Sequence, residues 1–373
     1  MKPTSPVAVD SAFDLPSLVL PRGLERAAEA VRAAGLGRTV RVEPRGRRGQ
    51  AAIVRLDDGS EVFVKLAPLD GVDAGMRTER EVAAARTLPG LTPAVLAAAE
   101  DGSWVVLEGV EGEPLSSTPT DLDLDTGLAA DLGAMLAAVH RAGHRGNPDR
   151  LRREAPVTDL PSAEVQLPPI DDVTPTRFAL APGFDYPVWL AFVQDEPLAG
   201  AIRDLAATWT VATLIHGDLR GDNVIATPTR RLVPVDWELG GLGDPRADLG
   251  ALVALYLSAW LSSIRATEDG ELADWLATAT VPLDAIRPPI DAAVRSYRDG
   301  VTSVADTRAD LELALRWAGA CLLRQALAIL DHRGGHAPSS RPLASSSRSP
   351  SRTSPTRASS CAMIWRSSAW LPR

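Results

Sequence analysis

The octapeptide HGDLRGDN, residues 216–223, lies between two apolar pairs, Leu214-Ile215 and Val224-Ile225. When apolar flanks that look buried enclose a polar centre, the polar residues are usually held there for a reason. Asp, Asn and Gly also favour turns, so an Asx-rich turn that caps a helix would account for the same residues. The residues downstream decide between a plain turn and a loop with a chemical role.

The spacing of three side chains with oxygen ligands favours the second interpretation. Asp218 and Asn223 are separated by four residues, and Asp236 follows thirteen positions after Asn223, at the end of an apolar run. The catalytic loop of protein kinases has the same Asp-x4-Asn spacing and is followed by a magnesium-binding Asp at a strand end. With VDWELGGLGDPRADLG at residues 235–250, the octapeptide resembles the aminoglycoside phosphotransferase and choline-kinase-like family. The resemblance extends from about residue 40 to residue 330.

This resemblance implies an α+β, protein-kinase-like fold with two lobes. The N-lobe, residues 23–112, would contain an antiparallel sheet and one main helix and would bind the nucleotide. The larger, mostly helical C-lobe, residues 113–332, would carry catalysis and acceptor binding and include an irregular insert at 146–186. Residues 1–22 would form an N-terminal extension. The Ser/Arg/Pro-rich residues 333–373 are expected to be a disordered tail.

Local sequence patterns indicate the same α+β class. The β-prone runs AAIVRL and EVFVKL flank an Asp-Asp-Gly-Ser turn and predict a hairpin over residues 51–66. A charged, Ala-rich stretch predicts a helix over residues 73–88 that stops at Pro89-Gly90. Further helices are expected over residues 24–31, 124–140, 186–209, 246–264, 268–279, 282–298 and 307–331, and strand-like runs over 104–115 and 231–239.

The family resemblance gives each residue of the loop a role. Phosphoryl transfer depends on positioning and charge neutralisation more than on covalent help from the protein. The resemblance implies that Asp218 orients or deprotonates the acceptor hydroxyl. Asn223 and Asp236 would bind Mg²⁺, which prefers hard oxygen ligands. Arg220 would hold the transferring phosphate, and we expect His216 to brace the loop backbone rather than to react.

A single lysine provides a check that does not depend on the loop. Of the 39 Lys and Arg residues, only Lys2 and Lys65 are lysines, and Lys65 lies in EVFVK. A kinase-like enzyme needs a strand lysine at this place for the α- and β-phosphates, where a compact ammonium serves better than a forked guanidinium. The kinase scheme pairs this lysine with a helical Glu. Glu81 in TEREVAAARTL best matches the family pattern, and Glu79 is the alternative.

Two further segments are expected to contact the nucleotide, which would be ATP or, as an alternative, GTP. PRGRRGQAA, residues 44–52, would form the turn that covers the phosphates, because Gly46 and Gly49 allow close approach of the backbone. Val106 to Gly109 falls where the family has its adenine-binding linker. The backbone of Val106 and Glu108 would bind the adenine there.

The downstream run GDPRADLG contains two more acidic residues. We expect Asp244 and Asp248 to cap a helix and brace a loop, with Asp248 as a third metal ligand as the alternative. The sequence contains no Walker A, GxSxG, HExxH or CxxC pattern. Other common nucleotide, hydrolase and metal-site classes therefore have no support.

The charge of the chain is unevenly distributed. The formal net charge is −9, but the segment after Asp331 has seven Arg and no acid, so residues 1–331 carry 32 basic and 48 acidic groups, or −16. This balance argues against nucleic acid as a partner. An acidic body would steer a cationic acceptor towards the protein, although it would also serve solubility alone.

The sequence also limits the compartment. Cys321 and Cys361 are the only cysteines, so no disulfide framework or thiolate metal cluster is expected. The longest uncharged apolar run, residues 249–264, is too short to span a bilayer, and we expect no membrane partner. With Asp10 and Asp14 near the start and no long apolar core, we expect no signal peptide and a cytoplasmic location.

Together these features predict an ATP- and Mg²⁺-dependent phosphotransferase that moves the γ-phosphate to a hydroxyl of a small molecule. The acceptor would be an aminoglycoside, amino alcohol, sugar or similar compound. An acidic segment at residues 157–196 would suit a cationic acceptor, but a solvated insert explains the same residues. One alternative is phosphorylation of Ser or Thr in a precursor peptide of a lanthipeptide-type maturation pathway. Another is a non-catalytic nucleotide-binding or scaffold protein.

Overall fold

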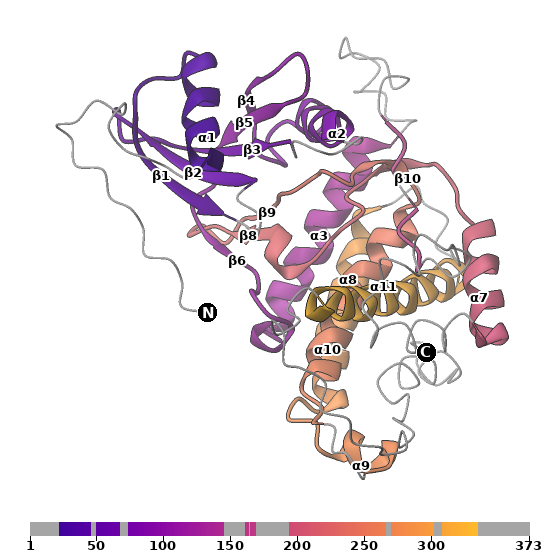
Figure 1. Cartoon of the computed structure of the whole chain (residues 1–373). Coiled ribbons are helices and arrows are strands. Elements are labelled where there is room, and N and C mark those ends of the chain that lie inside the picture. Colours follow the sequence, from indigo (N-terminus) through magenta and orange to yellow (C-terminus); the bar gives the residue numbers. More distant parts are fainter. Residues whose placement is uncertain are drawn as a thin grey trace, which may run out of the picture. The chain divides into compact units, whose positions relative to one another are not determined.

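The computed structural model describes two compact units of the chain, whose helices and strands are drawn in Figure 1. Unit 1 consists of Met1–Ser117, Met135–Glu164 and Ala212–Gly243, and unit 2 consists of Thr118–Ala134, Val165–Val211 and Asp244–Arg373. The residues that the structure describes are 22–45, 50–67, 74–144, 161–163, 165–168, 194–265, 270–301 and 308–334.

Unit 1 is built around a five-stranded antiparallel sheet with the order β1-β2-β3-β5-β4. The predicted hairpin is confirmed: in its turn the Leu56 amide donates to the Ser60 carbonyl at 2.9 Å, and Gly59 has a φ of 86°. Positive φ is favourable for glycine, which explains its place in the turn. The strands are β1 (Thr39–Arg45), β2 (Ala51–Leu56), β3 (Glu61–Leu66), β4 (Val95–Ala98) and β5 (Trp104–Glu108).

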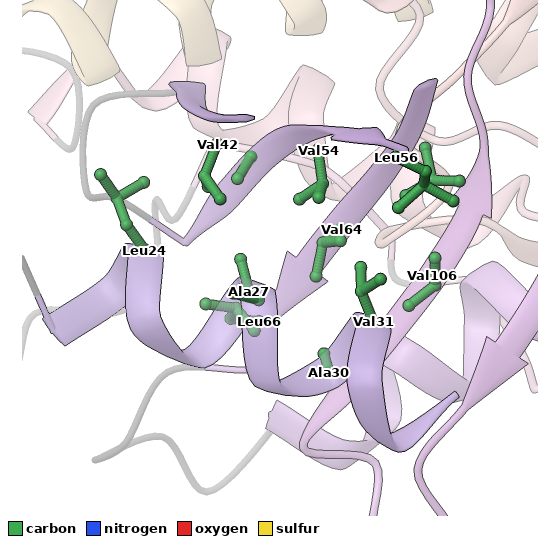
Figure 2. Packing of buried hydrophobic residues seen from close by; sticks show 13 residues of the cluster. Leu24, Ala27, Ala30, Val31, Val42, Val54, Leu56, Val64, Leu66 and Val106 are labelled. Carbon is green, nitrogen blue, oxygen red and sulfur yellow. The ribbon is translucent and has the colours of Figure 1, made fainter. Parts of the chain in front are cut away.

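Helix α1 (Arg22–Ala33) covers one face of this sheet. Figure 2 shows its apolar side chains meeting those of the strands in one cluster, which includes Val31, Val54 and Val64. Successive side chains of a strand point to opposite faces of the sheet. Because Val64 and Leu66 of β3 belong to the cluster with α1, Lys65 between them points to the opposite face.

Helix α2 (Ala74–Thr87) contacts β4, β5 and β10. It follows the predicted range closely and ends just before Pro89 and Gly90, where Gly90 has a φ of 78°. Ala84 and Leu88, on one side of this segment, lie in a buried cluster with Trp237. Helix α2 therefore packs on residues that follow the octapeptide by more than a dozen positions.

Short strands frame the octapeptide in unit 1. β7 (Thr213–Ile215) precedes it and pairs with β10 (Gly241–Gly243), while β8 (Val224–Ala226) follows it and pairs with both β6 (Glu113–Pro114) and β9 (Leu232–Pro234). The 3-10 helix η4 (Gly221–Asn223) closes the loop. The segment around Ser162 lies alongside β10 and bridges to Leu242 in parallel.

The described part of unit 2 is helical. Its most extensive helix–helix contact joins α8 and α11. The two helices can approach closely because Gly250 has no side chain, and a Cβ there would lie 2.5 Å from the Trp317 Cβ. Helix α3 starts in unit 2 and ends in unit 1. No helix among the described residues is long and apolar enough to cross a membrane. The elements are η2 (Pro119–Asp121), α3 (Thr126–Gly143), α7 (Glu196–Ala207), α8 (Pro245–Ser262), α9 (Leu272–Ala277), α10 (Leu283–Gly300) and α11 (Arg308–Gly334).

The structure differs from the sequence predictions at several boundaries. The strand expected over 231–239 ends at Pro234, because the residues after it turn out of the sheet. Helix α11 continues to Gly334 and so includes the first two residues of the expected tail, whose remainder lies outside the described residues. The same is true of most of the insert at 146–186 and of residues 186–193 in the expected helix over 186–209.

Candidate active site

Lys65 lies between two carboxylates in unit 1. Its Nζ is 2.5 Å from Glu81 Oε2 and 2.8 Å from Asp236 Oδ1. The three residues come from β3, from α2 and from the turn after β9. Glu79, the alternative partner of the lysine, is exposed on α2, whereas Glu81 is buried with only 3% of its surface accessible. The structure therefore pairs the strand lysine with Glu81.

The charges of this cluster stabilise one another. Burial by itself would lower the pKa of Lys65, but Glu81 and Asp236 outweigh it and raise that pKa above the ordinary value. Burial would raise the pKa of Asp236, but the Lys65 ammonium and its hydrogen bond outweigh burial and hold the pKa below its usual value. Lys65 and Asp236 are thus both charged at neutral pH.

Asp236 has an unusual backbone conformation. Its φ of 67° lies in the left-handed region, which is uncommon for residues other than glycine and is found most often for Asn and Asp. The amide that follows is fixed, because the Trp237 N–H donates to Glu81 Oε2 at 2.9 Å. One oxygen of Glu81 thus accepts hydrogen bonds from both the Lys65 ammonium and the backbone next to Asp236.

The octapeptide holds the other side of Asp236 through Val235. The Val235 amide donates to the Asn223 carbonyl at 2.9 Å, and the Val235 carbonyl lies 2.8 Å from His216 Nε2. The Asp218 amide donates to His216 Nδ1 at 3.3 Å. This bond makes Nδ1 the acceptor, so we assign the proton to Nε2, which donates to Val235. The placement of His216 agrees with the expected bracing role.

The side chains of Asn223 and Asp218 also meet. Asn223 Nδ2 donates to the Asp218 carbonyl at 2.9 Å and lies 3.4 Å from Asp218 Oδ2. These two acceptors fix the orientation of the carboxamide, because an oxygen in place of Nδ2 would face them without a proton. The Asn223 Oδ1 oxygen is then the atom that a cation could use.

The donor set fits a hard cation that completes its shell with other ligands. Within the described part of the chain, no group of three or more His, Cys, Asp or Glu side chains is arranged to hold a metal. Asn223 and Asp236 offer one carboxamide oxygen and carboxylate oxygens. Mg²⁺ typically takes one or two protein oxygens and completes its octahedron with water and phosphate oxygens, so this set is compatible with it.

Arg220 lies beside the carboxylates of its own loop. Its Nε is 3.4 Å from Asp218 Oδ2 and 3.3 Å from Asp222 Oδ1. The Arg220 side chain is 44% exposed, whereas that of Asp218 is 16% exposed. The guanidinium therefore remains accessible to an anionic ligand while it partly neutralises the loop carboxylates.

The residues expected to contact the nucleotide are described only in part. Gly46 and Gly49 lie outside the described residues, between β1 and β2, whose ends pair at Arg45 and Ala51. Val106 is an interior residue of β5, paired with both β3 and β4, and its side chain lies in the core cluster with α1. Glu108 ends the strand, and its amide donates to a carbonyl that precedes β4.

Two residues with close contacts to the Asp236 turn were not identified from the sequence. Trp237 is 1% exposed, and its ring centroid lies 4.7 Å from that of His216 with the two planes tilted by 46°. Arg80 is buried on α2. The available signals were a large aromatic residue directly after Asp236 and an arginine next to Glu81 on the same helix face. Neither signal is specific unless one already knows that α2 and the octapeptide lie next to the turn.

Comparisons with known proteins show the family of this chain. The model of the phosphotransferase enzyme family (APH) matches residues 40–281, which is more than half of the chain. Viomycin phosphotransferase from Streptomyces vinaceus is 27% identical over 265 residues, which cover 68% of this chain and 80% of the relative. The structure of LicA in complex with AMP superposes with a TM-score of 0.50 at 14% identity, over 85% of this chain and 93% of LicA.

These matches identify the architecture as well as the class of enzyme. The fold is the protein-kinase-like α+β fold, with an antiparallel sheet in the N-terminal part and a mostly helical remainder. The loop HGDLRGDN and the Lys65 cluster both lie within the range that the family model covers. The chain belongs to the phosphotransferase enzyme family, and it is a kinase-type enzyme with an alcohol group as acceptor.

Proposed function

We propose that this enzyme transfers the γ-phosphate of ATP, in the presence of Mg²⁺, to a hydroxyl group of a small molecule. The observation that carries the proposal is the Lys65 ammonium between Glu81 and Asp236. The turn of Asp236 is joined through Val235 to the loop that contains Asp218. This arrangement supports a nucleotide site next to a hydroxyl-activating carboxylate.

Asn223 Oδ1 and the Asp236 carboxylate would hold the metal. Bound Mg²⁺ would neutralise charge on the phosphates and help to orient them for transfer. Lys65, kept protonated by its two carboxylate neighbours, would donate to the α- and β-phosphate oxygens. Glu81 would keep the ammonium in place through its own ion pair. GTP is the alternative donor.

Asp218 and Arg220 would act at the transferred group. Asp218 Oδ2, close to Asn223 Nδ2, would accept a hydrogen bond from the acceptor hydroxyl and then its proton. The half-exposed Arg220 guanidinium would turn from the loop carboxylates to the phosphoryl oxygens, where a bidentate contact is strong. We expect Asp218 and Arg220 to act together because they are in contact in the structure.

The remaining nucleotide contacts are part of the same proposal. Gly46 and Gly49 would let the backbone between β1 and β2 cover the phosphates. Because Val106 is paired with both β3 and β4 inside the sheet, the adenine would bind at the end of β5, near Glu108 and Gly109. The structure of LicA contains AMP, which supports an adenine nucleotide as the donor for a chain of this fold.

We also propose that the N-lobe, residues 23–112, ends where the C-lobe, residues 113–332, begins.

The acceptor is proposed from similarity and from charge. Similarity to viomycin phosphotransferase makes viomycin and other hydroxyl-bearing antibiotics the first compounds to test. The formal charge of −16 over residues 1–331 favours a cationic acceptor. Amino alcohols and sugars would serve as further acceptor classes.

The proposal is tested by a transfer assay with a panel of acceptors. Purified protein is incubated with γ-labelled ATP, Mg²⁺ and viomycin, aminoglycosides, amino alcohols or sugars, and the labelled product is identified by mass spectrometry. We expect label in a compound with a free hydroxyl, and loss of transfer when EDTA removes Mg²⁺.

The other outcomes of this assay separate the alternatives. Mg²⁺-dependent binding of ATP without transfer to any compound in the panel would favour a peptide acceptor. Absence of ATP binding would contradict the proposed nucleotide site and support a scaffold role.

A further inference from the structure

One face of α2 is directed at the turn that contains Asp236. Side chains three and four residues apart lie on the same face of a helix. Arg77, Arg80 and Glu81 follow this spacing, and all three contact Trp237 or Glu238. Further along the same face, Ala84 and Leu88 pack in a buried cluster with the Trp237 ring. Trp237 and Glu238 of the turn therefore pack against this face of α2.

Two arginines of α2 contact Glu238, and Arg80 is the buried one of the two. It is 4% exposed, and its Nη1 donates to the Glu238 carbonyl at 3.5 Å while its Nη2 donates to the Ser162 carbonyl at 3.4 Å. A buried guanidinium is costly unless acceptors compensate for the lost water. The Arg77–Glu238 ion pair, by contrast, joins two half-exposed side chains and should contribute little.

The left-handed backbone of Asp236 needs support from both sides. Sparsely populated conformations of this kind persist only when the surrounding structure over-determines them. On the side of Val235 the support comes from His216 and Asn223. On the other side, Glu81 holds the Trp237 amide and Arg80 holds the Glu238 carbonyl.

We propose that Arg80 is a positioning residue that fixes the turn of residues 236–238 and so aims the Asp236 carboxylate at the metal. This inference rests on the proposed function, in which Asp236 is a metal ligand. Residues that orient a metal ligand contribute to affinity for the metal, and changing them typically costs about 10- to 100-fold. A residue that only stabilised the fold would not change the effect of Mg²⁺ on nucleotide binding.

The first test measures nucleotide binding rather than turnover. Calorimetry gives the affinity of the full chain for a non-hydrolysable ATP analogue with Mg²⁺ and with EDTA, for the wild type, Arg80→Met, Arg80→Lys and Arg86→Met. The factor by which Mg²⁺ increases affinity for the analogue should be about tenfold smaller in Arg80→Met than in the wild type. The affinity measured in EDTA should change little. Arg80→Lys keeps a cation but cannot span both carbonyls, so an intermediate loss is expected. Arg86 is exposed on the same helix, and its variant should match the wild type.

The second test follows the turn itself without nucleotide or metal. Hydrogen exchange of the peptide covering residues 235–243 should become about tenfold faster in Arg80→Met, as expected for the loss of one charge-assisted hydrogen bond. Arg86→Met should leave the exchange unchanged. This measurement remains informative if Arg80→Met is less stable, because exchange in β2 and β3 of the same unit reports the opening of that whole unit separately.

The outcomes distinguish this inference from the function on which it rests. An unchanged Mg²⁺ effect in Arg80→Met, with Mg²⁺ strengthening binding to the wild type, would overturn the role of Arg80 alone. Absence of any Mg²⁺ effect in the wild type would overturn the proposed metal site. Unchanged exchange over residues 235–243 would overturn the support of the turn by Arg80.

Discussion

Asp236 is the most constrained residue of the candidate site. Its carboxylate pairs with Lys65, its backbone is left-handed, and the peptide groups on both sides of it are hydrogen-bonded to other segments. Asp and Asn tolerate this conformation better than other residues with side chains. Asp236→Asn should therefore remove the charge and keep the backbone.

The pKa of Asp236 leads to a prediction about acid stability. The folded protein holds this pKa below 3.8 by means of Lys65, so protons bind more tightly to the unfolded chain than to the folded one. A lowered pKa contributes stability that is complete above the unfolded value and is lost as the pH falls through the folded value. We expect the free energy of unfolding of the wild type to exceed that of Asp236→Asn by a constant amount above about pH 5. The difference should shrink below about pH 4.

Urea denaturation of both proteins between pH 3 and pH 7 measures this difference. If the difference in the free energy of unfolding between the two proteins grew on acidification, burial and not Lys65 would control the pKa of Asp236. The account of the cluster as a charged, mutually stabilised set would then be wrong.

At the scale of elements, η4 and the segment after β6 meet without space for a side chain. The Leu115 amide donates to the Val224 carbonyl at 2.7 Å, and the Ser116 amide donates to the Gly221 carbonyl at 3.2 Å. A Cβ on Gly221 would lie 1.8 Å from the Ser116 Oγ and 3.0 Å from its Cβ. Gly221, the second glycine of HGDLRGDN, is therefore required by its close contact with Ser116.

This contact predicts a rescue. Gly221→Ala should destabilise the protein by about 1–3 kcal/mol, the usual cost of overpacking. Adding Ser116→Gly removes Oγ and Cβ, the two atoms nearest the new methyl group, so the double variant should be more stable than Gly221→Ala alone. A double-mutant cycle by urea denaturation measures the coupling. If the changes in the free energy of unfolding caused by the two single substitutions were additive in the double variant, the clash would not occur.

Elements with local signals were predicted well, and elements that depend on distant contacts were not. The β2–β3 hairpin and α2 have a turn or stop signal next to a clear pattern, and both were confirmed. β1 (TVRVEPR) and β4 (VLAA) are the edge strands of the sheet and were not predicted, because charged or small residues weaken their alternation. The run after Pro234 is strand-like by composition, but hydrogen bonds from α2 and the octapeptide hold it as a turn.

At the scale of the whole molecule, the site gathers segments that are far apart in the chain. Lys65 and Glu81 are 16 residues apart, and Lys65 and Asp236 are 171 residues apart. The sequence nevertheless suggested these three residues together, because a lone lysine on a strand, a helical Glu and a strand-end Asp match one scheme of phosphoryl transfer. The contact of Arg80 with Glu238 spans 158 residues and has no such pattern, so only the structure reveals it.

The central claim is that the loop HGDLRGDN carries out phosphoryl transfer through Asp218. The most direct measurement is the initial rate of γ-phosphate transfer by the wild type, Asp218→Asn and Asp222→Asn. The acceptor is the compound of the panel that the wild type phosphorylates to the greatest extent. The two variants make the same change in the same loop, and Asp222 is an exposed partner of Arg220. We predict that Asp218→Asn lowers the rate by about 10²- to 10⁴-fold, as for loss of a general base, while Asp222→Asn stays within about tenfold of the wild type. Equal rates for the two variants would contradict the assignment of Asp218 and with it the account of this loop.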